Sequence, residues 1–322
     1  MLKSASKVTI NTGNVLNLID IKKKAGQNVT EELSESIKLT LSEWSSQNGL
    51  PIQNGTESNS QHYMVVSTSK ASEAVVNITR PHDDVQIKMA EEDRKNLKIG
   101  VKIFINEDSP TALKECLDNV FSALQTELIE NVILSYNPDQ KDDRDDSVKT
   151  ASTKATPISH VGNVECQCDV SARNSNESEA ESDADARKCE AILPGIKTLW
   201  AVLEDYVKDG RVHQLGVADV GGGCLYKLHA WAIVKPTIAQ INLASCCVVP
   251  PSLHAFCKDN DVQLLTHADP PDLLTLAALR TLSDAGIGCN NLDWCARYQV
   301  HIKCRGVLAL KGYVCKATVG QQ

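Results

Sequence analysis

The sequence predicts an α/β protein built from repeated βαβ units. From residue 97 onward, short aliphatic runs alternate with longer segments whose apolar residues recur at helical spacing. Aromatic residues make up only 4% of the chain, which suits parallel strands surrounded by Leu, Ile, Val and Ala. Strands that alternate with helices imply right-handed βαβ units and a parallel sheet. We expect one domain over residues 1–322. Its first predicted fold is an eight-stranded (β/α)8 TIM barrel, and the second is an open doubly wound sheet.

The predicted strands are short β-rich runs with polar or turn-forming flanks. Six are visible, at residues 97–105, 131–136, 212–218, 237–243, 262–267 and 300–304. The first ninety residues have room for two more, although residues 65–92 are ambiguous. With those two, the run at 131–136 would be the fourth strand of a barrel.

The helices are predicted from caps, breakers and apolar spacing. Thr30 and the two following glutamates begin a helix over residues 30–47. Ser109-Pro110 begins the helix after the strand at 97–105, and Gly210 ends a helix that contains Trp200. Further helical segments are expected at residues 222–234, 251–260 and 271–298.

Residues 139–190 interrupt this alternation. They contain 13 Asp and Glu against 7 Lys and Arg, so they carry most of the formal net charge of −8. Large apolar side chains are few, and such a segment cannot offset the conformational entropy lost on ordering. We therefore expect a disordered, Ser/Asp/Glu-rich acidic insertion after the fourth strand.

Composition and charge exclude several classes of protein. Outside the acidic segment the chain is nearly neutral, which argues against binding to nucleic acid. The N-terminal residues MLKSASK lack the apolar core of a secretory signal, and no run approaches the ~18 apolar residues of a membrane span. Twelve cysteines in such a chain are expected to be reduced thiols of a cytoplasmic protein.

Local motifs carry little chemistry on their own. Gly221–Gly223 lacks the residues of a phosphate-binding loop and is interpreted as a flexible βα loop. Cys166 and Cys168 have no second pair at zinc-site spacing, so no metal site is expected. Cys246 and Cys247 follow a predicted strand, and are either small semi-buried hydrophobic residues or redox-active, partner-linking thiols.

The second half of the chain resembles the aldo–keto reductases, segment by segment. WAVLEDYVKDGRVHQLGVAD, at residues 200–219, is similar to the stretch that ends in Gly-Val-Ser-Asn after that family's fifth strand. PTIAQIN, LHAFCKDNDVQLLTH and VHIKCR follow in the order of its sixth, seventh and eighth strands. The resemblance implies an aldo–keto-reductase-like barrel, in a family that reduces carbonyls with NADPH through a Tyr acid assisted by Lys, Asp and His.

The catalytic positions of that family are incomplete in this sequence. The resemblance places Lys102, in GVKIFI, at the lysine position and Tyr136, in NVILSYNP, at the histidine position. The Asp-x-x-x-Tyr pair has no counterpart, because Tyr63 lies nearby without an Asp four residues before it. Since the four groups act as a unit, the resemblance implies vestigial positions and no catalytic residue.

The cofactor positions are altered as well. Ala218-Asp219 stands where the family has the Ser-Asn pair that holds the nicotinamide, and His267 stands where it has the stacking ring. Asn242 replaces the Glu of Gln-x-Glu. The positions that the resemblance still assigns to a vestigial, residual NADPH site are Gln240, Lys303 and Arg305.

Three stretches are similar to one further family, the regulatory (modifier) subunits of glutamate–cysteine ligase. They are EELSESIKLTLSEWSSQ, AQINLASCCVVPPSLHAFCKDNDVQLLTHADP and KCRGVLALKGY. The resemblance implies a non-catalytic subunit that forms a heterodimer with the catalytic subunit, improves glutamate use and relieves glutathione feedback inhibition in the first step of glutathione biosynthesis.

That resemblance also implies which groups belong to which subunit. ATP and Mg²⁺ belong to the catalytic subunit, and no cofactor is required by this chain. Cys246 or Cys247 is the candidate for a disulfide between the subunits. Two alternatives stay open, a divergent NADPH-dependent aldo–keto reductase and an adaptor that binds NADPH without turnover.

Overall fold

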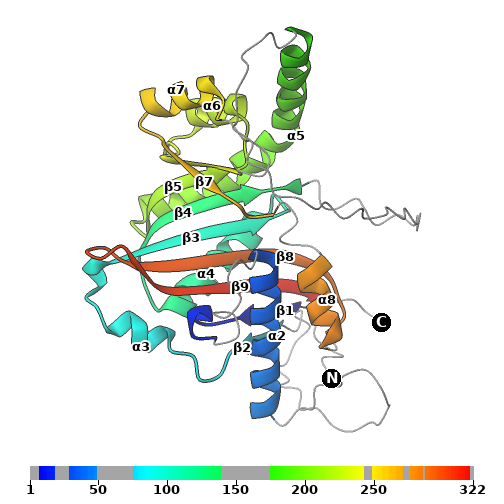
Figure 1. Cartoon of the computed structure of the whole chain (residues 1–322), viewed down its shortest axis with the longest axis vertical. Helices are drawn as coiled ribbons and strands as arrows, with labels where there is room; N and C mark the ends of the chain where they lie inside the picture. Colours follow the sequence, from blue (N-terminus) through cyan, green and yellow to red (C-terminus); the bar gives the residue numbers. More distant parts are fainter. Residues whose placement is uncertain are drawn as a thin grey trace, which may run out of the picture.

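A single mixed sheet organises the protein, and the α/β class is confirmed. The computed structural model describes residues 7–18, 29–48, 75–138, 175–242, 249–270, 276–285 and 287–319. Its nine strands follow the order β2-β1-β9-β8-β3-β4-β5-β6-β7 (Figure 1). They are β1 (Lys7–Asn11), β2 (Val75–Thr79), β3 (Leu97–Ile105), β4 (Ile129–Tyr136), β5 (Val212–Ala218), β6 (Ile238–Asn242), β7 (Gln263–His267), β8 (Cys289–Ile302) and β9 (Val307–Val319).

Helices cover both faces of this sheet. The longer ones are α2 (Val29–Gln47), α4 (Pro110–Leu124), α5 (Ser175–Lys208), α6 (Gly222–Trp231), α7 (Pro251–Asp259) and α8 (Leu276–Asp284). The short ones are η1 (Val15–Asn17), α3 (Val85–Ala90) and η2 (Arg94–Asn96). Helices α4 to α7 contribute to one large buried cluster, and α2 and α8 pack in a second cluster with β1, β8 and β9.

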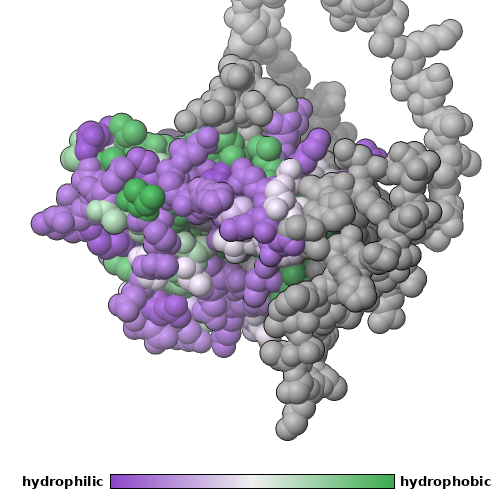
Figure 2. Space-filling view, turned by 90° about the horizontal axis from the view of Figure 1, so that it is seen from below, coloured by the Kyte–Doolittle hydropathy of each residue, from purple (hydrophilic) through white to green (hydrophobic). Residues whose placement is uncertain are grey.

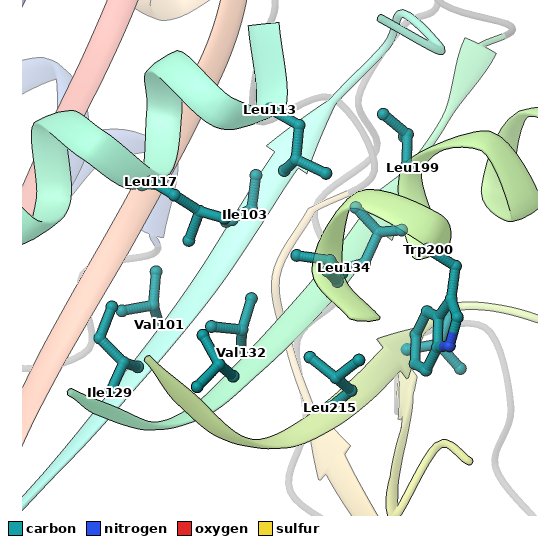
Figure 3. Packing of buried hydrophobic residues seen from close by; sticks show 14 of the residues in the cluster. Val101, Ile103, Leu113, Leu117, Ile129, Val132, Leu134, Leu199, Trp200 and Leu215 are labelled. Atoms are coloured by element: carbon teal, nitrogen blue, oxygen red, sulfur yellow. The ribbon is translucent and has the colours of Figure 1, made fainter. Parts of the chain in front are cut away.

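The parallel half of the sheet follows the sequence prediction. Strands β3 to β7 pair in parallel, and β3 and β5 have the predicted bounds. Alternate side chains of β3, such as Val101 and Ile103, point toward α4, where they meet Leu113 and Leu117 (Figure 3). Trp200 of α5 is fully buried in the same cluster, and its indole nitrogen donates a hydrogen bond to the carbonyl of Val234 at 3.0 Å.

The ends of α4 and α5 show why the helix boundaries could be predicted. The hydroxyl of Ser109 accepts a hydrogen bond from the backbone N–H of Ala112 at 3.2 Å, and Pro110 occupies the first turn. Gln125 closes α4 in the left-handed conformation. Gly210, with a φ of 71°, follows α5 in the conformation that only glycine adopts readily.

The boundary of the predicted disordered insertion is corrected by α5. This helix begins at Ser175, so residues 175–190 are helical, whereas residues 139–174 lie outside the described part of the chain. The correction has a physical reason in the composition of the segment. Ala, Glu, Lys and Arg, which are frequent in residues 177–190, are strong helix formers.

The C-terminal region differs most from the prediction. Residues 289–298, expected to be helical, form most of β8, and the expected strand at 300–304 is the end of β8 followed by a turn. Strands β8 and β9 form a long antiparallel hairpin, whose turn contains Gly306 at a φ of 62°. Alternation of buried side chains, as in Trp294, Ala296, Tyr298 and Val300, favours a strand over a helix here.

Closure into a barrel is not confirmed. The hairpin lies between β1 and β3 in the strand order. Strand β8 pairs antiparallel with the whole length of β3, from the pair Leu97 and Ile302 to the pair Ile105 and Trp294. Among the described residues, β2 and β7 are therefore the ends of the strand order. The eight-stranded barrel remains a prediction, and the mixed sheet with helices on both faces is the observed architecture.

Gly312 allows β9 to pass close to the N-terminal segment. A Cβ atom at this position would lie 2.2 Å from both the carbonyl oxygen of Gly13 and the hydroxyl oxygen of Tyr298. We expect Gly312→Ala to lower the free energy of unfolding by about 1–3 kcal/mol or more, because neither the backbone nor the buried ring can move away freely. The matched control is Gly223→Ala in α6, where no atom lies within 4 Å of the added methyl group.

Chemical denaturation of the two variants measures this difference. The control is expected to be neutral or more stable, because Ala is a better helix former than Gly by about 1 kcal/mol. Equal stability of Gly312→Ala and the native chain would contradict the close approach at Gly312.

Candidate functional site

The position that resembles the catalytic lysine lies in a buried ionic cluster. Lys102, on β3, is 4% exposed, and its ammonium group lies 2.8 Å from Oδ2 of Asp269. Arg297, on β8, binds the same carboxylate with both terminal nitrogens, at 2.5 Å to Oδ1 and 3.0 Å to Oδ2. Asp269 follows β7 in sequence, so one carboxylate joins three separate segments of the chain.

The two cations also share an aromatic neighbour. The Lys102 ammonium lies 5.3 Å and the Arg297 guanidinium 5.7 Å from the centre of the Phe104 ring. Such distances are within the range of a cation–π interaction, which offsets part of the cost of removing the two charges from water. Lys102 and Arg297 are direct partners in the β3–β8 pairing, which explains their proximity.

His267 connects this cluster to the surface. Its Nε2 lies 2.9 Å from Oδ1 of Asp219, a partly exposed residue at a φ of 60° directly after β5. Its Nδ1 accepts a hydrogen bond from the backbone N–H of Asp269 at 3.1 Å, so the neutral ring carries its proton on Nε2. When protonated, Nδ1 can instead face the Asp269 carboxylate, 3.3 Å away.

The charges of the cluster shift one another's protonation. Burial lowers the pKa of Lys102, although Asp269 opposes this shift. Burial alone would raise the pKa of Asp269, but hydrogen bonds from His267 and Arg297 and the nearby cations hold that pKa far below its ordinary value. Burial also disfavours charged His267, yet its hydrogen bonds to Asp219 and Asp269 raise the pKa of the imidazole. The cluster is therefore a set of mutually compensated ions.

A row of polar side chains continues across the hairpin. Arg297 pairs with Tyr313 on β9, and the Tyr313 hydroxyl donates a hydrogen bond to Oε1 of Glu32, in α2, at 2.5 Å. The same oxygen lies 2.6 Å from the ammonium of Lys311. Burial, followed by the nearby Glu32 carboxylate, raises the pKa of Tyr313 well above its ordinary value. Such a hydroxyl is a poor proton donor to a substrate.

Tyr136 lies on the other face of the sheet. Its register partner is Ile105, whereas Lys102 pairs with Ile133, and side chains alternate between faces along a strand. A Cβ atom added to Gly195 of α5 would lie 2.5 Å from the Tyr136 hydroxyl, which places that hydroxyl against the helix layer. The structure therefore does not bring Tyr136 to Lys102. Of the five tyrosines in the described residues, Tyr313 is the one on the Lys102 face, and Tyr63 lies outside them.

The residues expected to hold NADPH are not gathered in one place. Lys303 and Arg305 lie in the β8–β9 turn, beside the N-terminal end of β3, where they pair with Glu130 and Glu92. Gln240 lies on β6, toward the opposite end of the parallel strands. From Leu97 to Lys102 alone the chain advances about 17 Å at about 3.3 Å per residue. Lys303 and Arg305 thus lie toward the opposite end of the strands from Gln240, and the assignment of these three residues to a residual NADPH site stays a prediction.

Asn242 and Gln240, which stand where the resemblance places Gln-x-Glu, both lie on β6. Asn242 donates a hydrogen bond from Nδ2 to the carbonyl of Asp269 at 2.7 Å, and so helps to position that residue. The side-chain oxygen of Gln240 is buried and has no hydrogen-bond partner among the described residues. Together with Asp219 and His267, these residues surround the ionic cluster at the C-terminal ends of β5 to β7.

Other predicted site residues fall outside the description. Cys246 and Cys247 lie outside the described residues, as do Cys166 and Cys168. Of the described cysteines, Cys304 is the exposed one. Within the same part of the chain, no group of three or more His, Cys, Asp or Glu side chains could hold a metal ion, and no helix has the length and apolar character needed to cross a membrane.

Sequence reasoning missed Asp269 and Arg297, the two residues that complete the cluster. Asp269 lies in the stretch HADPP directly after β7, where the end of a parallel strand and two prolines mark a loop. Arg297 lies in the stretch LDWCARYQV, which was predicted to be helical as far as residue 298. Recognising this stretch as a strand would have placed Arg297 on the opposite face from Trp294, Ala296 and Tyr298.

Several solved aldo–keto reductases align with about half of the chain at low structural similarity. Aldose reductase of Giardia lamblia is 17% identical, with a TM-score of 0.33 over 55% of this chain and 47% of that one. Aldose reductase of Schistosoma japonicum is 11% identical, with a TM-score of 0.32 over 55% and 48%. An aldo–keto reductase complexed with NADPH is 16% identical, with a TM-score of 0.34 over 56% of this chain and 41% of that one. No protein-family model matches the chain.

Curated sequences give a more particular similarity. The chain is 28% identical over 98% of its length to the glutamate–cysteine ligase regulatory subunits of Mus musculus and Homo sapiens, and covers 94% of each. A putative subunit of the same name from Schizosaccharomyces pombe is 28% identical over 37% of this chain and 43% of its own length. The chain is thus similar over almost its whole length to glutamate–cysteine ligase regulatory subunits, and the resemblance inferred from the sequence is confirmed.

Removal of the central carboxylate tests the ionic cluster. Asp269→Asn leaves Lys102 and Arg297 buried without a counter-ion, so we expect the free energy of unfolding to fall by about 3–5 kcal/mol. Asp259→Asn, on the exposed end of α7, is the matched control and is expected to have little effect. If Asp269→Asn is as stable as the control in urea titrations, the cluster does not support the fold in the way described.

The pH dependence of stability tests His267. Its raised pKa means that its stabilising contribution is complete below about pH 6.5, the ordinary value of a histidine, and is lost as the pH rises through the folded-state pKa. The stability difference between the native chain and His267→Gln should therefore shrink between pH 6 and pH 9. His213→Gln, at an exposed position, serves as the control. If the stability difference between the native chain and His267→Gln grows as the pH rises, the raised pKa of His267 is contradicted.

Proposed function

We propose that this chain is the non-catalytic regulatory subunit of a glutamate–cysteine ligase and that it binds the catalytic subunit as a heterodimer. The observation that carries the proposal is the similarity to curated regulatory subunits over 98% of the chain. The similarity includes both ends of the sequence, so the whole domain, and not one motif, is related to these proteins.

The geometry around Lys102 supports a non-catalytic role. The lysine that would assist a proton donor in a reductase is bound to Asp269, and Tyr313, the tyrosine on its face of the sheet, is bound to Glu32. A proton donor must reach its substrate at hydrogen-bond distance with a pKa near the working pH. Neither condition is met by a buried hydroxyl whose pKa is raised and whose proton is shared with a carboxylate.

The cofactor side agrees with this proposal. Lys303 and Arg305 form surface ion pairs away from the ends of β5 to β7, and Asn242 holds the backbone of Asp269. Contacts within the protein at these positions support a structural role for them. On this proposal ATP and Mg²⁺ belong to the catalytic subunit, and this chain needs no cofactor.

Regulation then requires a difference in affinity between two states of the catalytic subunit. Preferential binding to the state that uses glutamate, over the state inhibited by glutathione, would improve glutamate use and relieve feedback inhibition. A coupling free energy of about 1–3 kcal/mol corresponds to a shift of about 5- to 150-fold. A docking surface on a stable scaffold is sufficient for this role, and no chemistry by the chain is needed.

Kinetics of the mixed subunits test the proposal. The purified chain alone should form no γ-glutamylcysteine, and its addition to the catalytic subunit should lower the KM for glutamate and raise the Ki for glutathione several-fold. Co-purification and initial rates at saturating chain measure both effects. Unchanged kinetics at saturation would overturn the regulatory role, and aldehyde-dependent NADPH oxidation by the chain alone would indicate a reductase.

A further inference from the structure

Three large apolar side chains are exposed on and just after α6. Tyr226, Trp231 and Ile233 are 61%, 43% and 77% exposed. The opposite side of the same helix, with Leu225 and Leu228, is buried in the core. Tyr226 and Trp231 therefore add exposed apolar area to α6 beside the exposed Lys227, whereas a surface helix normally presents a mainly polar face to water. We call Tyr226, Trp231 and Ile233 the α6 surface.

The α6 surface is held in place by its neighbours. The Tyr226 ring contacts Phe256 of α7 edge-on, with centroids 5.8 Å apart, and the Lys197 ammonium lies 5.1 Å from the centre of the Trp231 ring. The backbone N–H groups of Ile233 and Val234 both donate hydrogen bonds to Oε1 of Glu204, at 2.7 and 2.9 Å. A preorganised apolar surface loses little conformational entropy when it is covered.

The segment that carries the α6 surface is basic, although the whole chain is acidic. Residues 222–236 contain Lys227 and Lys235 and no Asp or Glu, and Lys197 stands over Trp231, in a chain of formal net charge −8. This charge attracts a surface that combines an apolar recess with carboxylates. A symmetric contact with a second copy would bring the same lysines of both copies together, so the charges disfavour that occupant.

We propose that the α6 surface is the docking site for the catalytic subunit, which meets it with an apolar recess bordered by Asp and Glu side chains. This inference rests on the proposed function and specifies where the partner binds. Trp and Tyr are enriched among the residues that contribute most to protein interfaces, and Trp231 and Tyr226 are exposed within one helix of each other. The site lies at the end of the molecule where α6 and α7 are adjacent (Figure 1).

The opposite end of the molecule provides the matched control. Figure 2 shows that face as mostly hydrophilic with scattered hydrophobic groups. Ile87, in α3, is 65% exposed, close to the exposure of Ile233. Single exposed apolar residues of this kind are normal on a protein surface. Ile87→Asp therefore makes the same chemical change as Ile233→Asp away from the α6 surface.

The experiment measures the affinity of the full-length chain for its catalytic subunit by titration calorimetry at two salt concentrations. Ile233→Asp is expected to weaken binding at least ten-fold, and Ile87→Asp is expected to stay within two-fold of the native chain. Lys227→Glu, at an exposed position, should weaken binding several-fold and reduce its salt dependence. Circular dichroism and thermal melting verify that each variant is folded.

The outcomes separate this inference from the proposed function. If the native chain binds the catalytic subunit and Ile233→Asp binds it equally well, the docking site is overturned and the proposed function stands. If the native chain does not bind the catalytic subunit, the docking site and the proposed function are both overturned. Two further measurements use the chain by itself. Self-association in sedimentation velocity, or binding to phosphatidylcholine–phosphatidylserine vesicles, that is lost in Ile233→Asp would assign the surface to a second copy or to a membrane and overturn the inference.

Discussion

The carboxylate of Asp269 is the interaction on which the centre of the structure depends. Two cations from neighbouring strands, Lys102 and Arg297, are buried beside it, and neither charge could be removed from water without a close counter-ion. The carboxylate comes from the segment after β7, so it joins the end of the parallel sheet to the β3–β8 pairing. A residue that resembles a catalytic lysine is thereby part of the scaffold.

The β8–β9 hairpin extends this connection to both ends of the chain. Lys102, Arg297 and Tyr313 are consecutive partners across β3, β8 and β9, and Tyr313 is bound in turn to Glu32 of α2. On its far side β9 pairs with β1, which is the first described strand. The N-terminal helix, the hairpin and the parallel strands thus share one row of polar contacts, and a change at any member affects segments that are far apart in sequence.

The sequence predicted local features well and long-range pairing poorly. Strands 97–105 and 212–218 and the cap at Ser109 depend on neighbouring residues, and all three were found as predicted. The antiparallel pairing of β8 with β3 joins residues nearly two hundred positions apart, and nothing local indicates it. Asp269 and Arg297 were missed for the same reason, because their role exists only once that pairing has formed. Residues 175–190 were mistaken for disorder because their charges were weighed more heavily than their helix propensity.

The interior and the surface of the protein differ in one respect that bears on regulation. Inside, the buried charges around Asp269 compensate one another, and the hydroxyl of Tyr313 has a carboxylate as its partner. On the α6 surface, by contrast, aromatic and aliphatic side chains remain exposed to water, with the Lys197 ammonium over the Trp231 ring. Burial of such side chains lowers the free energy of an assembly by about 25 cal/mol per Å² of apolar area removed from water. The free energy available to this protein from covering apolar area therefore lies at the α6 surface and not at the ionic cluster around Asp269, whose charges already have partners within the protein.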